Sequence, residues 1–444
     1  MQNLITSALA GVAQDVERNR LENIANAWAA YSGSTEYTVK DKDTGINLNP
    51  AKIIVDETVS FLFGENVTFD LDEASTDRTP EEQYLDAFWA ANKKMTRLHG
   101  MAMNGAIAGH CFVKIHEQPG MAYPRVIVLD PETVTVTTAA DDIDNHLKYV
   151  IAYSSIDPTD SKPIGIRQVI ERNPGGATWQ VTDQRGKGGV TAVTNWVTIE
   201  SRTWPHAYPP IVECQNLPNP NQLWGIADLE PDLLDLIKKT NFVTSNNVKI
   251  LKYFAHPKFM VYGAIGAEVN VNPDEAIAIQ DVNARAEFLE MHGDLEASHK
   301  MIKLLKEAIY TNSRTPEIAT GKVENVGALS GLALKVLYMP LIQKTKTKRV
   351  TYGDMLVELN RRVLDMAGMG SNNISTIKWQ EMLPVDPVTK LQEIQAAKEM
   401  GVSNATIMSQ HGYDPDLEAE QKAKESDLGA ALLRSFDQGV GISG

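Results

Sequence analysis

The chain has 444 residues, 43% of them hydrophobic, and a formal net charge of −15. The length favours several modules with cores of their own, and the acidity argues against a conventional duplex-binding protein, because affinity for phosphates rests on Lys and Arg. No apolar run approaches the roughly 20 residues that span a bilayer, and only Cys111 and Cys214 occur, so we expect a soluble protein made in a reducing compartment.

The first hundred residues carry helical patterns. Residues 1–31 predict an amphipathic helix rather than an export signal. Residues 49–64 open with Asn-Pro, continue with a dense apolar set and stop at a glycine, which predicts a buried helix. Another helix is expected from about Pro80 to Gly100, continuing into residues 101–110.

The pattern then changes to short β-rich runs. Residues 111–117, 123–138 and 146–155 are separated by Pro, Gly and Asp clusters, and they predict neighbouring strands of a mixed or antiparallel sheet. Residues 167–204 predict a meander whose glycine-rich turns connect the strands.

A helix, an insert and a second helix follow. The helical pattern from Asp228 to Ala255 has Pro231 in its first turn, where the missing N–H costs little. The insert predicts a strand, a glycine-containing turn and a strand within residues 258–282, after which AEFLEM leads through Gly293 into a helix at about 294–313.

That second helix has two distinct rows. Its apolar stripe has steps of three and four residues, and a different row is basic. A solvated basic face on an amphipathic helix is the plain alternative to a functional row of charge. The stripe contains Leu295, Ile302, Leu305 and Ile309, and the basic row contains Lys300, Lys303 and Lys306.

A polar loop then leads into a long basic helix that we expect to begin near Ser330. Three glycines within residues 320–331 give the backbone wide conformational freedom, and the polar residues favour exposure to solvent. The loop is therefore predicted to be mobile. Its three apolar residues could instead anchor it. Lys335–Arg362 contains seven bases against two acids, which could also be an ordinary solvated face.

The C-terminal part predicts a strand around Ile377 to Trp379 and then helices, with a disordered tail beyond Leu432. A helix-turn-helix within residues 403–420 is an alternative. The lack of Lys and Arg on its candidate recognition helix argues against DNA reading.

The sequence contains no catalytic signature. Gly186-Lys187 and Gly321-Lys322 lack the earlier glycine and the following Ser or Thr of a phosphate-binding loop, and Ser330 lacks the glycines of a hydrolase elbow. We therefore expect a protein that is not an enzyme and has no cofactor.

Possible metal ligands gather at one place only, in the segment HCFVKIH. Strand alternation would send His110 and His116 to the same face, with Cys111 between them on the other. With no third or fourth ligand nearby, we expect two surface imidazoles on a packed strand and no metal site.

The order of these elements, above all TPEIATGKVENVGALSG leading into LALKVLYMPLIQKTKTKRVTYGDMLVELNRR, resembles the portal protein of tailed double-stranded-DNA bacteriophages. The resemblance implies an α+β fold with an α/β wing, a two-helix stem, a small α/β clip insert, a long wing helix and an α-helical crown. The implied divisions are 1–222 (wing), 223–256 (stem helix), 257–292 (clip), 293–315 (second stem helix), 316–331 (tunnel loop), 332–385 (long helix and wing) and 386–444 (crown and tail).

The resemblance also implies sites and partners. The basic row would form rings of charge in the stem, and the clip would touch partners. The loop residues expected near DNA are Thr320, Gly321, Lys322, Val323, Glu324, Asn325 and Val326, and the clip candidates are Lys258, Glu268, Asp274, Glu275 and Arg285.

The implied assembly is a homo-oligomeric ring of about twelve subunits at one capsid vertex of the virion, made in the bacterial host cytoplasm. Double-stranded DNA would pass through it without sequence-specific contacts. The implied protein partners are the terminase large subunit, a head-completion or adaptor protein, and the major capsid and scaffolding proteins, without a membrane. A head-tail connector or capsid-assembly protein without a portal channel is the alternative.

Overall fold

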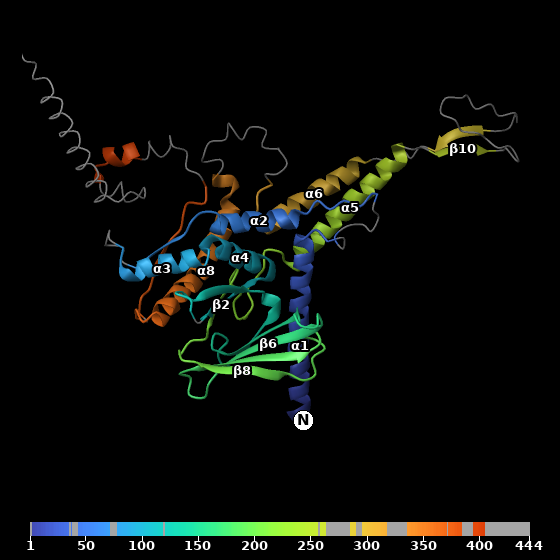
Figure 1. The fold of residues 1–444 in the computed structure, drawn as a ribbon. Helices are drawn as coiled ribbons and strands as arrows, with labels where there is room; N and C mark the ends of the chain where they lie inside the picture. Colours follow the sequence, from blue (N-terminus) through green and yellow to red (C-terminus); the bar gives the residue numbers. More distant parts are fainter. Residues whose placement is uncertain are drawn as a thin grey trace, which may run out of the picture.

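The computed structural model describes residues 2–34, 37, 43–71, 78–118, 120–255, 258–262, 285–289, 295–317, 335–370, 372–383 and 394–404. Only the backbone is described for residues 2–15, 253–255, 258–261 and 285–289. Helices and strands both contribute extensively, which confirms the α+β class (Figure 1). Within the described residues, no helix is long and apolar enough to cross a membrane.

The N-terminal half supplies four helices, each begun by recognisable signals. Asn49 caps α2 by accepting a hydrogen bond from the Lys52 backbone N–H, and Thr79 and Glu82 form a capping box at the start of α3. The helices are α1 (Gln2–Tyr31), α2 (Pro50–Phe63), α3 (Pro80–Ala91) and α4 (Lys94–Ala108).

The single helix predicted from Pro80 to Gly100 is wrong, because the chain breaks between α3 and α4. Lys93 has a φ of 55°, in the left-handed region. The Asn92 side chain donates to Pro124 O at 2.9 Å and accepts from Val126 N at 2.8 Å. These bonds to a later segment stabilise the break, and a sequence pattern does not reveal them.

Two antiparallel sheets follow, as predicted. The first has the order β3-β2-β9, and the second is the predicted meander, with the order β4-β5-β6-β7-β8. A short 3-10 turn, η2 (Pro131–Thr133), joins β3 to β4. The strands are β2 (His110–His116), β3 (Arg125–Leu129), β4 (Val134–Thr138), β5 (His146–Ile156), β6 (Pro163–Arg172), β7 (Trp179–Lys187), β8 (Val197–Trp204) and β9 (Ile211–Gln215).

The next helices, α5 (Pro231–Ala255) and α6 (Glu296–Ser313), run side by side and project from the body, with β10 (Lys258–Tyr262) at the far end (Figure 1). β10 pairs antiparallel with β11 (Arg285–Leu289). The second strand predicted before residue 283 lies outside the described residues, and the segment AEFLEM, predicted to lead into α6, contributes its first four residues to β11.

The long basic helix is present as α8 (Met339–Met366), and its predicted start near Ser330 lies outside the described residues. Residues 335–337 are helical, and a turn at Tyr338 separates them from α8. Pro340 lies in the first turn of α8, where a proline is tolerated, so the chain restarts its helix there. The predicted strand near residue 377 is present as β12 (Thr376–Lys378), which pairs with β1 (Thr68–Asp70).

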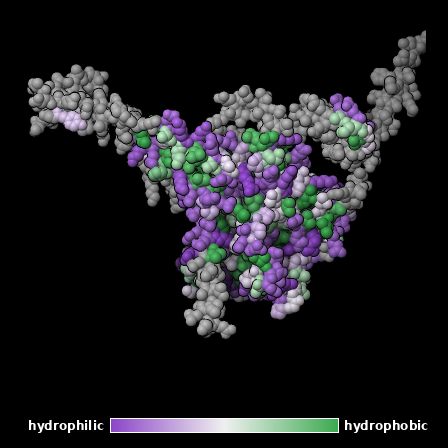
Figure 2. Space-filling view, turned by 180° about the vertical axis from the view of Figure 1, so that it is seen from behind, coloured by the Kyte–Doolittle hydropathy of each residue, from purple (hydrophilic) through white to green (hydrophobic). Residues whose placement is uncertain are grey.

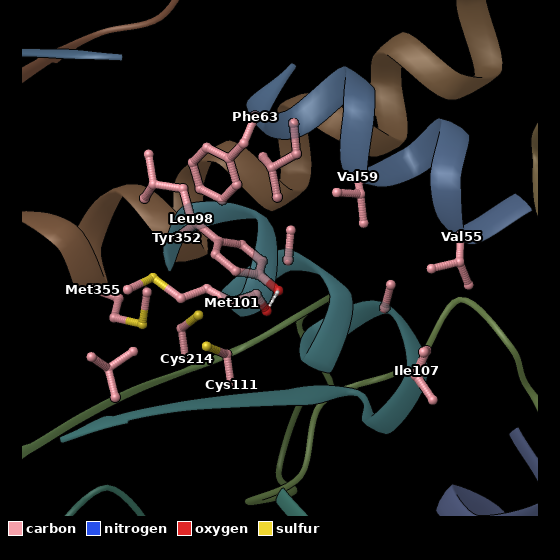
Figure 3. Close-up of a cluster of buried hydrophobic side chains, with 14 of the residues drawn as sticks. Val55, Val59, Phe63, Leu98, Met101, Ile107, Cys111, Cys214, Tyr352 and Met355 are labelled. Carbon is pink, nitrogen blue, oxygen red and sulfur yellow. Dashed lines mark hydrogen bonds between the residues drawn. The ribbon is translucent and has the colours of Figure 1, made fainter. Parts of the chain in front are cut away.

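The main core lies among α2, α4, α8 and the β2–β9 pair. Figure 3 shows Tyr352 of α8 pointing into it, with its hydroxyl bonded to the Met101 carbonyl at 3.4 Å. Gly105 makes room for this ring, since a Cβ there would lie 1.8 Å from the Tyr352 oxygen. Cys111 and Cys214 face each other across β2 and β9 as buried free thiols. A second core, which includes Phe112, joins β2 to the inner face of the meander.

Candidate functional site: the projecting helix pair and the ion cluster at its base

The predicted apolar stripe of α6 is confirmed at its centre. Leu305 and Ile309 are buried, and Leu295 and Ile302 are partly buried at the same side. Burying this face against α5 leaves the basic row in solvent, as helical spacing requires.

The basic row of α6 is largely neutralised by its own helix. The Lys300 Nζ lies 2.8 Å from Glu296 and the Lys303 Nζ lies 3.8 Å from Glu307, both at i,i+4 spacing. Pairs of this kind contribute about 0.3–0.5 kcal/mol each. Among the described residues of α6, Lys306 has no such partner. The three lysines and the two glutamates together therefore carry a net charge of +1 rather than the +3 of the lysines alone.

The buried face of α5 is unusually polar. Ser245 accepts from Ile46 N at 2.9 Å, and Asn241 accepts from Leu48 N at 3.2 Å while donating to Tyr37 O at 2.9 Å. These bonds tie the segment before α2 along the helix. As a result, α5 uses polar side chains for contacts within the chain.

The solvent side of the helix pair is correspondingly apolar in one place. Phe242 is 57% exposed and Met301 is 48% exposed, and they line a groove of about 310 Å³ together with Val243 and Leu305. Lys238 and Lys239 complete the rim. Sequence analysis did not single out this groove, although Phe242 stands in a polar stretch of its helix.

A cluster of buried charges lies at the base of the pair. Asp228 is followed by α5, and Lys344 and Lys348 extend from α8 one turn apart. The Lys344 Nζ lies 2.8 Å from Asp228 Oδ1, and the Lys348 Nζ donates to Asp228 Oδ2. All three residues are at most 4% exposed.

Neighbouring groups satisfy the rest of the cluster. Thr58 of α2 donates its hydroxyl to Asp228 Oδ2 at 3.1 Å, and the Asp228 N–H donates to Ala106 O at 2.7 Å. Lys344 donates a further bond to the Ser313 carbonyl, at 2.9 Å, where α6 ends. The cluster therefore joins α2, α4, α6 and α8 to the start of α5.

Burial and charge act in opposite directions on these groups. Burial alone would raise the pKa of Asp228, but the two ammonium groups beside it hold that pKa well below its usual range. Burial lowers the pKa of Lys348 to about 8, although the Asp228 carboxylate opposes this shift. Two buried cations thus share one anion.

This cluster corrects the interpretation of Lys335–Arg362 as a solvated basic face. Lys344 and Lys348 are buried in the chain's own interior, so they cannot form part of a basic surface. Both described flanks of the predicted loop are held here, because Ser313 precedes it and Lys344 follows it. In the sequence, Lys344 and Lys348 are visible as two lysines at i,i+4 spacing, but nothing local indicates that Asp228 is their partner.

Most of the other predicted site residues lie outside the described residues. These are the loop residues 320–326, together with Glu268, Asp274 and Glu275. Lys258 and Arg285 are placed by their backbones at opposite ends of the β10–β11 ladder, where they pair with Leu289 and Tyr262.

The expected pair of surface imidazoles is wrong for His110, which is 2% exposed. Its Nε2 lies 3.3 Å from Glu213 of β9, and His146 of β5 lies 2.6 Å from the same carboxylate. Tyr149 donates to Glu213 at 3.1 Å. This group links the two sheets. The His110 side chain can be buried because Glu213, on the neighbouring strand β9, supplies a polar partner in the interior.

Comparison with known proteins gives one strong match. The family model described as phage portal protein, SPP1 Gp6-like, matches residues 13–428. No curated protein sequence matches the chain at a significant level.

Matches among solved structures include chains of gene transfer agent (GTA) particles. The neck of the empty GTA particle computed with C6 symmetry has 12% identity and a TM-score of 0.48, covering 85% of this chain and 96% of that chain. The neck of the native particle computed with C12 symmetry has 12% identity and a TM-score of 0.45, covering 82% and 90%. The virion of the native particle has 11% identity and a TM-score of 0.46, covering 88% and 99%. Because its model spans nearly the whole sequence, the family match decides the matter: this chain belongs to the SPP1 Gp6-like family of phage portal proteins.

Proposed function

We propose that the chain forms a ring of about twelve copies whose channel carries double-stranded DNA during packaging, retention and ejection. The family already implies a structural, portal or head-tail connector role. In this proposal the ring sits at one vertex of the virion capsid. There it meets the terminase large subunit first and a head-completion or adaptor protein afterwards, with major capsid and scaffolding proteins around it.

The apolar groove on the helix pair is the observation that carries the proposal. Phe242 and Met301 are largely exposed on α5 and α6, the helix pair that projects from the body in Figure 1. Leu304, on the neighbouring flank of α6, is 61% exposed. A second copy placed beside the first would remove these side chains from water, and repetition of such a head-to-tail contact closes a ring.

The rest of the surface does not offer one large alternative patch on the face shown in Figure 2. There, hydrophobic residues are scattered among hydrophilic ones over the body. Scattered apolar residues are normal on soluble proteins and do not mark an interface. We therefore base the proposed contact between copies on the helix pair, whose groove is lined by the exposed Phe242 and Met301.

The charge of the helix pair suits a conduit. A channel must let DNA slide without deep electrostatic wells, and the Glu296 and Glu307 carboxylates reduce the positive charge of the α6 row. We propose that residues 320–326 form the loop that approaches DNA, between flanks held by the Asp228 cluster.

The proposed clip and crown are assigned from the order of structural elements in portal proteins. We propose that residues 257–292, around the β10–β11 hairpin, contact the motor and the adaptor protein, and that residues 386–444 form the crown. Lys258 and Arg285 stand at opposite ends of the hairpin ladder, so they would lie at separate positions in any such contact.

Native mass spectrometry with negative-stain imaging of the purified chain tests the ring directly. We expect a closed ring with a central hole for the wild type, and a shift to monomers for Phe242→Glu, because a charge would enter the apolar contact. Ile156→Glu is a matched control, since Ile156 is 68% exposed at the end of β5. A compact dimer or tetramer without a hole would refute the channel and favour a connector of another kind.

A further inference from the structure

A second candidate site lies in the body, away from the projecting helices. It is a cleft of about 890 Å³ between β2 and the open end of the meander. The loop after β2 and the end of α8 form its walls. This volume is within the range of about 300–1,000 Å³ that is typical of ligand sites.

The alternation of β2 explains how the cleft acquires polar side chains. One face of the strand carries His110, Phe112, Lys114 and His116 in turn. Phe112 belongs to the core beneath the meander, and Lys114 and His116 line the cleft where the two sheets separate. The strand therefore runs from a packed interior into a partly open site.

Charges on the meander side are already paired with each other. Arg202 lies 3.1 Å from Asp183 and 3.4 Å from Glu200, and Gln168 donates to Asp183 at 2.5 Å. Among the described residues, no carboxylate lies within the 4.0 Å ion-pair distance of Lys114. Lys114 therefore has no direct ion-pair partner in the described part of this cleft. Burial lowers its pKa, and the more distant charge of Asp183 opposes that shift.

Positive charges predominate among the groups that act on His116, beside Lys114. Burial lowers the pKa of His116, and the charges of Lys114, Arg202 and Arg125 lower it further, with Asp183 alone opposing them. Two other lining residues have buried polar atoms without a hydrogen-bond partner, Nε1 of Trp204 and Oε1 of Gln168. A bound ligand with both an anionic group and polar groups would satisfy this set.

We infer that the cleft binds an extended peptide segment of a protein partner, with a carboxylate side chain of that segment paired to Lys114. The apolar part of the lining suits a peptide, since Tyr84, Met121 and Tyr123 stand beside Pro124 and Pro205. Duplex DNA fits poorly, because it requires several available cations, whereas Arg202 of the described lining is already paired with acids and leaves mainly Lys114. This inference does not depend on the ring or its channel.

Fluorescence anisotropy with two labelled peptides tests the inference on the full chain. The probe is the acidic octapeptide YDPDLEAE, taken from residues 413–420, and its control carries Asn and Gln in place of the four acids. We expect the acidic peptide to bind and the amide control to bind about ten-fold more weakly or less, because only a carboxylate forms the charge-assisted bond.

Lys114→Met should weaken the acidic peptide to the level of the amide control while leaving the circular dichroism spectrum unchanged. Lys187→Met is the matched control, because Lys187 is exposed at the far end of β7, and it should bind like the wild type. Absence of binding at millimolar peptide, equal binding of both peptides, or an unchanged affinity in Lys114→Met would each overturn the inference. Tighter binding of a labelled short DNA duplex than of the acidic peptide, lost in Lys114→Met, would assign the cleft to nucleic acid instead.

Discussion

The Asp228 cluster makes an asymmetric prediction about charge removal. Replacing Asp228 with Asn leaves Lys344 and Lys348 buried without an anion, whereas replacing Lys348 with Met leaves one cation opposite one anion. Both substitutions remove the Lys348–Asp228 ion pair, but the first leaves two unpaired buried cations and the second leaves none. Asp228→Asn should therefore destabilise the chain far more than Lys348→Met.

The magnitude follows from burial. Removing one partner of a buried ion pair costs about 3–5 kcal/mol when a charge is left uncompensated, and Asp228→Asn leaves two such charges. For Lys348→Met we expect a change within about 1.5 kcal/mol, because the methionine fills similar space and Asp228 keeps Lys344 and Thr58 as partners.

The pH dependence gives an independent check. Burial holds the pKa of Lys348 at about 8 in the folded chain, against its ordinary value of 10.5, so the unfolded chain binds more protons between these values. Stability should therefore rise with pH across this window, by roughly 3 kcal/mol from this residue. Lys348→Met should lack that part of the rise.

Urea unfolding at pH 7.5 and pH 10, followed by circular dichroism and by hydrogen exchange in α8, measures these effects. Comparing wild type with Lys348→Met at both values cancels the other groups that titrate there. Equal losses for Asp228→Asn and Lys348→Met, or the same pH dependence in wild type and Lys348→Met, would refute the two-cation, one-anion account.

Three further predictions follow from other parts of the chain. Deleting residues 321–326 should leave ring assembly in native mass spectrometry intact while reducing DNA packaging, and loss of the ring would contradict this division of roles. Gly105→Ala should cost about 1–3 kcal/mol in thermal unfolding, because its Cβ would collide with the Tyr352 hydroxyl, and an unchanged midpoint would disprove the packing. His110 and His146 hold the pKa of Glu213 near 2 despite its burial, so the stability that this carboxylate contributes above pH 4.5 should fall progressively toward pH 2, and Glu213→Gln should lose that dependence in acid titration.

Local signals in the sequence predicted much of the fold. The Asn-Pro start of α2, the turns of the meander and the stripe of α6 all depend on residues a few positions apart. Such signals act through backbone preferences and one-sided burial, which the sequence displays directly. For this reason the order of the elements could be predicted closely.

The failures involve contacts between distant segments. The break after α3 depends on Asn92 bonding to Pro124 and Val126, and the burial of Lys348 depends on Asp228, 120 positions earlier. His110 was expected at the surface because its partner Glu213 lies on another strand. A charged or polar residue without a visible partner is interpreted as solvated, so sequence reasoning misplaces the ones that pair in the interior.

The cluster also limits how a channel loop in this chain could move. Apolar contacts between helices tolerate small sliding movements, but separating an ion pair in a water-free interior is costly, because the charges lose attraction without gaining hydration. Displacing α8 would separate Lys344 and Lys348 from Asp228, and displacing the end of α6 would remove the Ser313 carbonyl from the buried Lys344 ammonium. If the chain forms the proposed channel, we therefore expect movement of the loop to leave the end of α6 and the start of α8 in place. Hydrogen exchange should then show equal protection of both helix ends in empty and DNA-filled particles, and loss of protection at either end on filling would contradict the anchor.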